Sequence, residues 1–315
     1  MSAPPLPTTH IAEIAPSAAD EPWLVRSLWP ASAVGLIGGP PKCAKTWLAL
    51  DLALSVASNT PCLDTLTVES PGPVLLYLAE DSLQSARARV DGISQHRGLD
   101  LRRADLHLIT SPSLRLDQEF DKQRLAATVA AIRPRLLLLD PFVRLHRSDE
   151  NDSGAISAIL ADLRTLQRSF DVAVLLVHHS RKNGRGPQGY ALRGSGDLYA
   201  WGDAYAYLSR RDSSFRLSLE HRSRPAIDPL ALRLVSRSDG SATHLEIDAD
   251  KCHSPAASLE SLAVKELTAA GTALTRTQLR ARLKVNNQRL GVALDALERT
   301  GRAKKTRQGW LCDTP

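Results

Sequence analysis

The sequence predicts an α/β protein, in which a parallel sheet flanked by helices is followed by a small C-terminal domain. Between residues 33 and 177, short apolar runs alternate with segments of helical periodicity, and several runs are apolar on both faces, as in buried parallel strands. The 315-residue chain is 43% hydrophobic, enough for one sizeable core and a smaller second one. Positive charge is concentrated near the end: residues 255–311 carry eleven Lys or Arg and four Asp or Glu, a net of +7, against −1 for the remainder.

Each element of the main domain follows from a local pattern. The strands of the parallel sheet are expected at 33–37, 74–78, 106–109, 136–139 and 172–177. The helices between them are expected at 46–57, 83–96, 124–132 and 155–169. Four later runs are expected to add short, antiparallel strands at the sheet edge: 204–208, 215–219, 230–235 and 244–247. Residues 1–20, rich in Pro, Ala, Ser and Thr, are expected to form a flexible arm, which leaves domains at 21–250 and 251–315.

Two classes of protein are not expected. No apolar run approaches the roughly 18 residues that span a bilayer, and the first residues lack the pattern of a secretory signal. The four cysteines, at positions 43, 62, 252 and 312, show neither metal-ligand spacing nor a disulfide framework. We therefore expect a cytoplasmic protein.

A phosphate-binding loop is predicted between the first strand and the first helix. Its residues are Gly39, Pro40, Pro41, Lys42, Cys43, Ala44, Lys45 and Thr46. They match G-x-x-x-x-G-K-[ST], except that Ala44 replaces the second glycine. Lys45 is expected to reach the β- and γ-phosphates of ATP, and Thr46 to hold Mg²⁺. An alanine at position 44 is tolerable only where its φ is negative. The alternative interpretation of residues 39–46 is an ordinary turn between a strand and a helix.

Charged side chains follow the ends of three other strands. Asp140 ends a run of four leucines and is placed to hold the Mg²⁺ shell, since ligands bind at the carboxyl edge of parallel sheets. Glu80 follows another strand and could orient or deprotonate the attacking water, whereas Asp81 is expected to cap the next helix. One of His178 and His179 is expected to sense the γ-phosphate. The alternative for Asp140 is a residue that caps a turn or helix. The alternative for His178 and His179 is a packed or exposed side chain without a functional role.

Two basic segments come later. The glycine-rich loop 180–195 carries Arg181, Lys182 and Arg185, which could contact a nucleic-acid backbone or be solvated. Arg222 and Arg224 could reach a neighbouring subunit's γ-phosphate as an arginine finger, or form surface ion pairs.

In this order the motifs resemble those of a known family. The segments are the loop 39–46, YLAEDS with Glu80, LLLLDPFVRLH with Asp140, LLVHHSRK with both histidines, and LRGSGDLYAWGD. They resemble the RecA-like ATPases of the RepA type, which are hexameric replicative helicases, over residues 22–237. The resemblance implies a RecA fold, Mg-ATP bound between subunits of a ring, and Glu80 as the catalytic glutamate. It also implies Asp140 as the Walker B carboxylate, a histidine sensor and a finger at Arg222 or Arg224.

The C-terminal domain resembles a winged helix-turn-helix. Helices are expected at 259–270, 275–283 and 286–299, followed by a basic hairpin at 301–311. The third helix would enter the major groove by its first turn, where Asn287 and Arg289 suit base edges. Lys304, Lys305 and Arg307 of the hairpin would hold phosphates. The alternative is the same fold used for protein contact.

We therefore expect an oligomeric, DNA-associated ATPase that uses ATP and Mg²⁺, of which a replicative helicase or related motor is one form. The alternative is a regulator, in which nucleotide binding sets the oligomeric state and DNA is bound with little ATP turnover.

Overall fold

The computed structural model describes most of the chain and divides it into two compact units, residues 1–248 and 249–315. The described ranges are 5–14, 22–149, 152–179, 196–211, 214–237, 242–248, 259–283, 285, 287–299, 301–306 and 308–312, with the backbone alone at 196, 211, 261, 287–289 and 292. Each unit is described by itself. No helix in these ranges is long and apolar enough to cross a bilayer.

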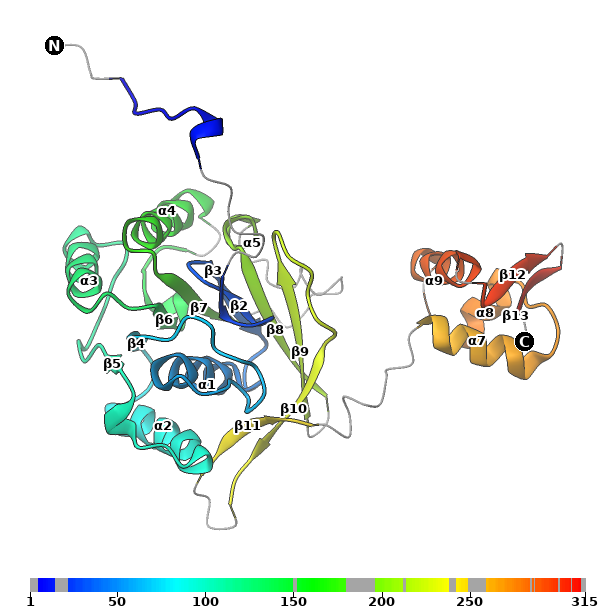
Figure 1. The fold of residues 1–315 in the computed structure, drawn as a ribbon, viewed down its shortest axis with the longest axis horizontal. Coiled ribbons are helices and arrows are strands. Elements are labelled where there is room, and N and C mark those ends of the chain that lie inside the picture. Colours follow the sequence, from blue (N-terminus) through cyan, green and yellow to red (C-terminus); the bar gives the residue numbers. More distant parts are fainter. Residues whose placement is uncertain are drawn as a thin grey trace. The chain divides into compact units, whose positions relative to one another are not determined.

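The first unit is built on a nine-stranded sheet in the order β11-β10-β9-β8-β3-β7-β6-β4-β5 (Figure 1). The six parallel strands are β3 (Val34–Gly39), β4 (Val74–Leu78), β5 (Leu106–Leu108), β6 (Leu136–Asp140), β7 (Ala173–His179) and β8 (Ala204–Arg211). Antiparallel strands extend the β8 edge: β9 (Ser214–His221), β10 (Leu230–Val235) and β11 (His244–Ile247). The sheet is therefore mixed rather than parallel. Strands β9, β10 and β11 are antiparallel additions as expected, whereas the run 204–208 forms β8, which pairs parallel with β3 and corrects the expectation of an antiparallel strand there.

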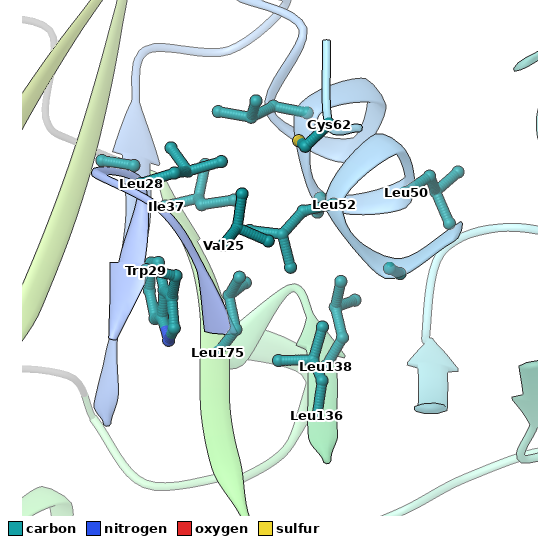
Figure 2. Packing of buried hydrophobic residues seen from close by; sticks show 14 of the residues in the cluster. Val25, Leu28, Trp29, Ile37, Leu50, Leu52, Cys62, Leu136, Leu138 and Leu175 are labelled. Atoms are coloured by element: carbon teal, nitrogen blue, oxygen red, sulfur yellow. The ribbon is translucent and has the colours of Figure 1, made fainter. Parts of the chain in front are cut away.

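Helices cover both faces of this sheet. One face packs against α1 (Lys45–Ser58) and α2 (Leu83–Arg97), and the other against α3 (Glu119–Ile132), α4 (Ser153–Phe170) and α5 (Gly196–Trp201). Successive strand residues alternate between the two cores: Leu136 and Leu138 face α1, whereas Leu137 and Leu139 face α4. Figure 2 shows the first core, with Leu136 and Leu138 of β6 on the same side of α1 as Leu52. Burial on both faces is why these strands read as unbroken apolar runs.

A small hairpin closes the amino-terminal side of the first core and was not expected from the sequence. It comprises β1 (Trp23–Val25) and β2 (Trp29–Pro30). Trp29 and Val25 are fully buried in the first core (Figure 2). Strands of three and two residues, one of them ending in proline, have no alternation long enough to detect.

Other differences from the expected elements are local. Helix α3 begins five residues earlier than expected, at Glu119, and α5 was not expected. Three short 3₁₀ turns, η1 (Ile11–Glu13), η2 (Leu101–Arg103) and η3 (Phe142–Arg144), were also not expected. Of these, η3 matters most because it follows directly from β6 and Asp140.

The second unit contains three helices and a hairpin, as expected. They are α7 (Leu259–Ala270), α8 (Arg276–Leu283), α9 (Asn287–Arg299), β12 (Ala303–Thr306) and β13 (Gly309–Cys312). Thr275 caps α8 reciprocally: its hydroxyl accepts from the Gln278 backbone N–H, and the Gln278 side chain accepts from the Thr275 N–H. Leucines of all three helices pack with Trp310 in a separate core.

Candidate functional site

The loop between β3 and α1 depends on a close backbone approach at Gly39. Its φ is +154°, and a Cβ there would lie 2.2 Å from the carbonyl oxygen of Leu208 and 2.7 Å from Cys43 Sγ. No larger residue fits without moving β8 away from β3. The glycine therefore lets the chain leave β3 beside β8 and turn back over the carboxyl edge of the sheet.

Ala44 occupies the position where such loops usually carry glycine, and its conformation corrects the expectation of a negative φ. The residue has φ 65° and ψ 24°, in the left-handed region, directly before α1. Its carbonyl accepts the first helical hydrogen bond, from the Leu48 N–H at 3.1 Å. A Cβ in this region costs about 1–2 kcal/mol, because it crowds the following carbonyl oxygen. The loop thus has a left-handed residue directly before α1, a conformation that glycine would adopt without this cost.

Lys45 is the first residue of α1 and lies within the loop. Its ammonium donates to the carbonyl oxygens of Gly39 at 3.0 Å and Pro40 at 2.8 Å, and the residue is only 5% exposed. Burial lowers the pKa of Lys45, while the nearby Cys43 and Asp140 raise it. A desolvated cation beside the N-terminus of a helix is a favourable environment for phosphate.

Thr46 and Asp140 provide oxygen ligands suited to Mg²⁺. The Thr46 hydroxyl donates to Asp140 Oδ2 at 2.7 Å, across α1 and β6. Burial raises the pKa of Asp140 to about 6, and the hydrogen bond from Thr46 opposes that shift. A hydroxyl and one carboxylate match the way Mg²⁺ binds, with few protein oxygens and the rest from phosphate and water. Within the described ranges, no set of three or more His, Cys, Asp or Glu side chains could hold a metal by itself.

Glu80 lies beyond the end of β4, next to β6. Its Oε1 accepts from Arg144 Nε at 2.8 Å, and its side chain is 48% exposed. The neighbouring Asp81 does not cap α2, which corrects the expectation: the Ser82 hydroxyl accepts from the Ser85 N–H instead. Asp81 Oδ2 instead accepts a hydrogen bond from Arg89 Nη1 at 2.7 Å.

The two histidines at the end of β7 point to opposite faces of the sheet. His178 is buried against Phe142, with ring centroids 6.5 Å apart, and desolvation lowers its pKa to about 4. His179 is exposed and lies in register with Gly39 on the neighbouring strand. Burial of its ring lowers the pKa of His179, and the positive charge of Lys45 lowers it further. Both rings are therefore neutral at neutral pH, and His179 is the one beside the loop.

A cavity of about 260 Å³ brings these side chains together. Lys45, Thr46, Glu80, Asp140 and His179 all line it, with Lys42, Cys43 and Ala44 of the loop. The sequence did not point to its other walls, which come from Trp47, Arg89, Phe215 and Leu234. Phe215 and Leu234 belong to the antiparallel strands, and only the folded sheet edge places them near the loop.

Arg222 and Arg224 lie elsewhere, at the amino-terminal edge of the parallel strands. The Arg222 N–H donates to the carbonyl of Asp203, which precedes β8, and its guanidinium lies 3.5 Å from the Asp203 carboxylate. Arg224 stacks over Trp23 at 4.3 Å. Both line a second cavity of about 550 Å³ that also contains Arg135, Arg164 and Arg168. These arginines are not brought to the phosphate loop of their own chain.

The residues expected to contact DNA are placed only in part. Lys304 and Lys305 are exposed on β12. Asn287 lies at the start of α9 and Arg289 in its first turn, where the structure describes the backbone. Arg181, Lys182, Arg185 and Arg307 lie outside the described residues.

Comparison with known proteins gives one family and several solved structures. Residues 2–185 match the AAA domain family. The ATPase domain of G40P is 19% identical, with a TM-score of 0.50 over 65% of this chain and 82% of that chain. A DnaB-like replicative helicase, whose structure was described together with its interactions with primase, is 18% identical to this chain. Its TM-score is 0.52, over 71% of this chain and 58% of that chain. The RadB recombinase is 19% identical, with a TM-score of 0.50 over 69% and 90%. At these identities the likeness is one of fold, and the fold is RecA-like.

Proposed function

The chain belongs to the AAA domain family and is a RecA-like P-loop ATPase, and we propose that it hydrolyses Mg-ATP as an oligomer that acts on DNA. The observation that carries the proposal is the convergence of Lys45, Thr46, Asp140, Glu80 and His179 on one cavity. Asp140, Glu80 and His179 come from the carboxyl ends of strands or directly after them, and Lys45 and Thr46 begin the helix that follows the loop; this is the edge where ligands of such sheets bind.

Each side chain has a role that its position supports. Lys45 and the first N–H groups of α1 hold the β- and γ-phosphates, and Thr46 with Asp140 holds Mg²⁺. The cation, when bound, neutralises charge that develops on the phosphate oxygens. Glu80 orients the attacking water and accepts its proton. His179, neutral and in register with Gly39, donates a hydrogen bond to the γ-phosphate.

Oligomerisation is supported by the distance between the two arginines and the loop. Arg222 is anchored beside Asp203, and Leu208 of β8 is the residue that Gly39 approaches. Five residues of extended chain separate these points, about 16 Å. Arg222 and Arg224 cannot serve the site of their own chain, so we propose that one of them reaches the γ-phosphate held by a second copy. We propose a ring of the RepA type as this assembly.

A role on DNA is supported by the charge of the second unit. We propose that α7 to β13 form a winged helix-turn-helix, with Lys304, Lys305 and Arg307 on phosphates and Asn287 and Arg289 at base edges. Replacing the three cations by alanine should lower the slope of log K against log salt by about 0.9 for each phosphate that is no longer neutralised. Arg181, Lys182 and Arg185 of the loop 180–195 would bind the backbone of a single strand in addition.

A second function is favoured by one observation, the strained conformation of Ala44. A loop weakened by that residue would bind ATP and turn it over slowly, and the protein would act as a nucleotide-gated DNA-binding regulator.

Steady-state hydrolysis of Mg-ATP, with and without single- and double-stranded DNA, separates the two functions. We expect turnover that rises when DNA is added. ATP binding with negligible turnover, combined with sequence-selective duplex binding at moderate salt, would instead support the regulator. Absence of ATP affinity up to millimolar concentrations would overturn both.

A further inference from the structure

Arg144 lies next to the site but has no role in the function described so far. It ends the short turn η3, which follows Asp140 with only Pro141 between them. Because β4 and β6 are neighbours with Leu78 in register with Asp140, the segments that leave the two strands run side by side. Arg144 is thereby placed opposite Glu80.

The interaction between the two side chains uses only part of the carboxylate. Arg144 Nε donates to Glu80 Oε1 at 2.8 Å. Among the residues that the structure describes, Glu80 Oε2 has no hydrogen-bond partner. A guanidinium on one oxygen fixes the plane of the carboxylate and leaves the second oxygen available to another donor.

The pair contributes little to holding the fold. The side chains are 61% and 48% exposed, and water weakens an ion pair exposed to that extent until it contributes little to stability. An interaction of that size is compatible with a role in orientation rather than in stability.

The backbone of η3, by contrast, is firmly held. Arg115 Nη1 donates to the Arg144 carbonyl at 2.5 Å, and the Leu116 N–H donates to the Leu145 carbonyl at 2.6 Å. The Arg144 N–H itself donates to the Pro141 carbonyl at 3.1 Å. The Arg144 side chain therefore extends from a well-held backbone that directly follows Asp140 in the chain. Through its hydrogen bond to Glu80, this segment connects the two carboxylates of the site.

We propose that Arg144 is a positioning residue for hydrolysis: it holds Oε1 of Glu80 so that Oε2 faces the attacking water. The inference rests on the proposed role of Glu80. Arg144 is not among the described residues that line the cavity of the phosphate loop, and its loss should leave the loop and the Thr46–Asp140 pair intact. It should therefore alter kcat and leave KM for ATP nearly unchanged.

The test is steady-state Mg-ATP hydrolysis by the full-length protein and three single variants. Arg144→Ala should lower kcat about 10–100-fold, the range for residues that support a catalytic group, with KM within about twofold. Arg144→Lys should recover part of kcat, because an ammonium still reaches Oε1. Arg87→Ala is the matched control, since Arg87 Nε bonds Asp91 Oδ2 at 2.7 Å with similar exposure on α2, away from the site. It should leave kcat unchanged.

Two further variants, Glu80→Gln and the double variant Arg144→Ala with Glu80→Gln, separate the possible failures. If Arg144 acts through Glu80, the double variant should be as slow as Glu80→Gln alone. Equal kcat in wild type and Arg144→Ala, with Glu80→Gln inactive, would overturn the inference and leave the proposed function standing. An active Glu80→Gln would overturn the role of Glu80 itself. A raised KM with unchanged kcat in Arg144→Ala would assign Arg144 to nucleotide binding and would also overturn the inference.

Discussion

Replacing Ala44 by glycine tests the geometry of the phosphate loop directly. With φ at 65°, the alanine methyl crowds the following carbonyl, at a cost of about 1–2 kcal/mol. Glycine removes that cost, but it also raises the conformational entropy of the unfolded chain. This second effect lowers the free energy of unfolding by about 0.4–1 kcal/mol. Ala44→Gly should therefore raise the free energy of unfolding by about 0.5–1 kcal/mol, or the melting temperature by about 1–4 °C for a unit of this size.

The effect on nucleotide affinity depends on whether the loop keeps its shape without ATP. If the left-handed conformation persists, the strain is the same in both states and affinity is unchanged. If the free loop relaxes, glycine tightens binding by at most the strain released, which is up to about tenfold at 1.4 kcal/mol. Urea denaturation and calorimetric titration with Mg-ATP measure the two quantities separately. A weaker affinity is not expected in either case.

Two further variants make the test specific. Asn59 also has a left-handed backbone, with φ 54°, but lies past the far end of α1. Asn59→Gly should change stability slightly and leave ATP affinity alone. Ala44→Val should act in the opposite direction from glycine, because a β-branched side chain is least tolerated at positive φ. If Ala44→Gly instead destabilised the protein by more than about 1 kcal/mol, as a glycine does inside a helix, the left-handed assignment would be refuted.

Four other outcomes follow from the site and the second unit. Lys45→Ala should abolish Mg-ATP binding by calorimetry, because the ammonium at the head of α1 is removed. Glu80→Gln should bind Mg-ATP normally and hydrolyse it about 10²–10⁴-fold more slowly in single-turnover assays. A protein that ends at Asp248 should keep ATP affinity and lose most duplex affinity at matched salt; equal DNA binding would make the second unit a module for binding another protein. Burial raises the pKa of Asp140 from 3.8 to about 6, so the native state retains a proton in that window that the unfolded chain has released. Raising the pH from 3.8 to 6 should therefore lower the free energy of unfolding relative to Asp140→Asn, measured by urea titration.

The parts of the site that could be predicted are those set by local sequence. Unbroken apolar runs identified the central strands, and polar residues after three of these runs, Glu80, Asp140 and His178-His179, identified the edge expected to bind ligand. Arg144 could not be singled out, because its hydrogen bond to Glu80 spans 64 positions and depends on which strands are neighbours. Phe215 and Leu234 were missed for the same reason. The φ of Ala44 was predicted with the wrong sign, because the loop imposes a conformation that alanine by itself avoids.

The strand order explains how residues so far apart in the chain divide the work. β3, β7, β6 and β4 are consecutive in the sheet, and they contribute the loop, His179, Asp140 and Glu80 in that order. Adjacent strands lie about 4.8 Å apart, so the end of β4 is about 14 Å from the end of β3. Glu80 nevertheless lines the same cavity as the loop, where its side chain is hydrogen-bonded to Arg144. Asp140, one strand nearer, meets Thr46 only because α1 begins over β7 and β6. The proposed roles of the loop in binding and of Glu80 in water activation fall on the two ends of this set of strands, so substitutions at Lys45 and Glu80 should affect different steps.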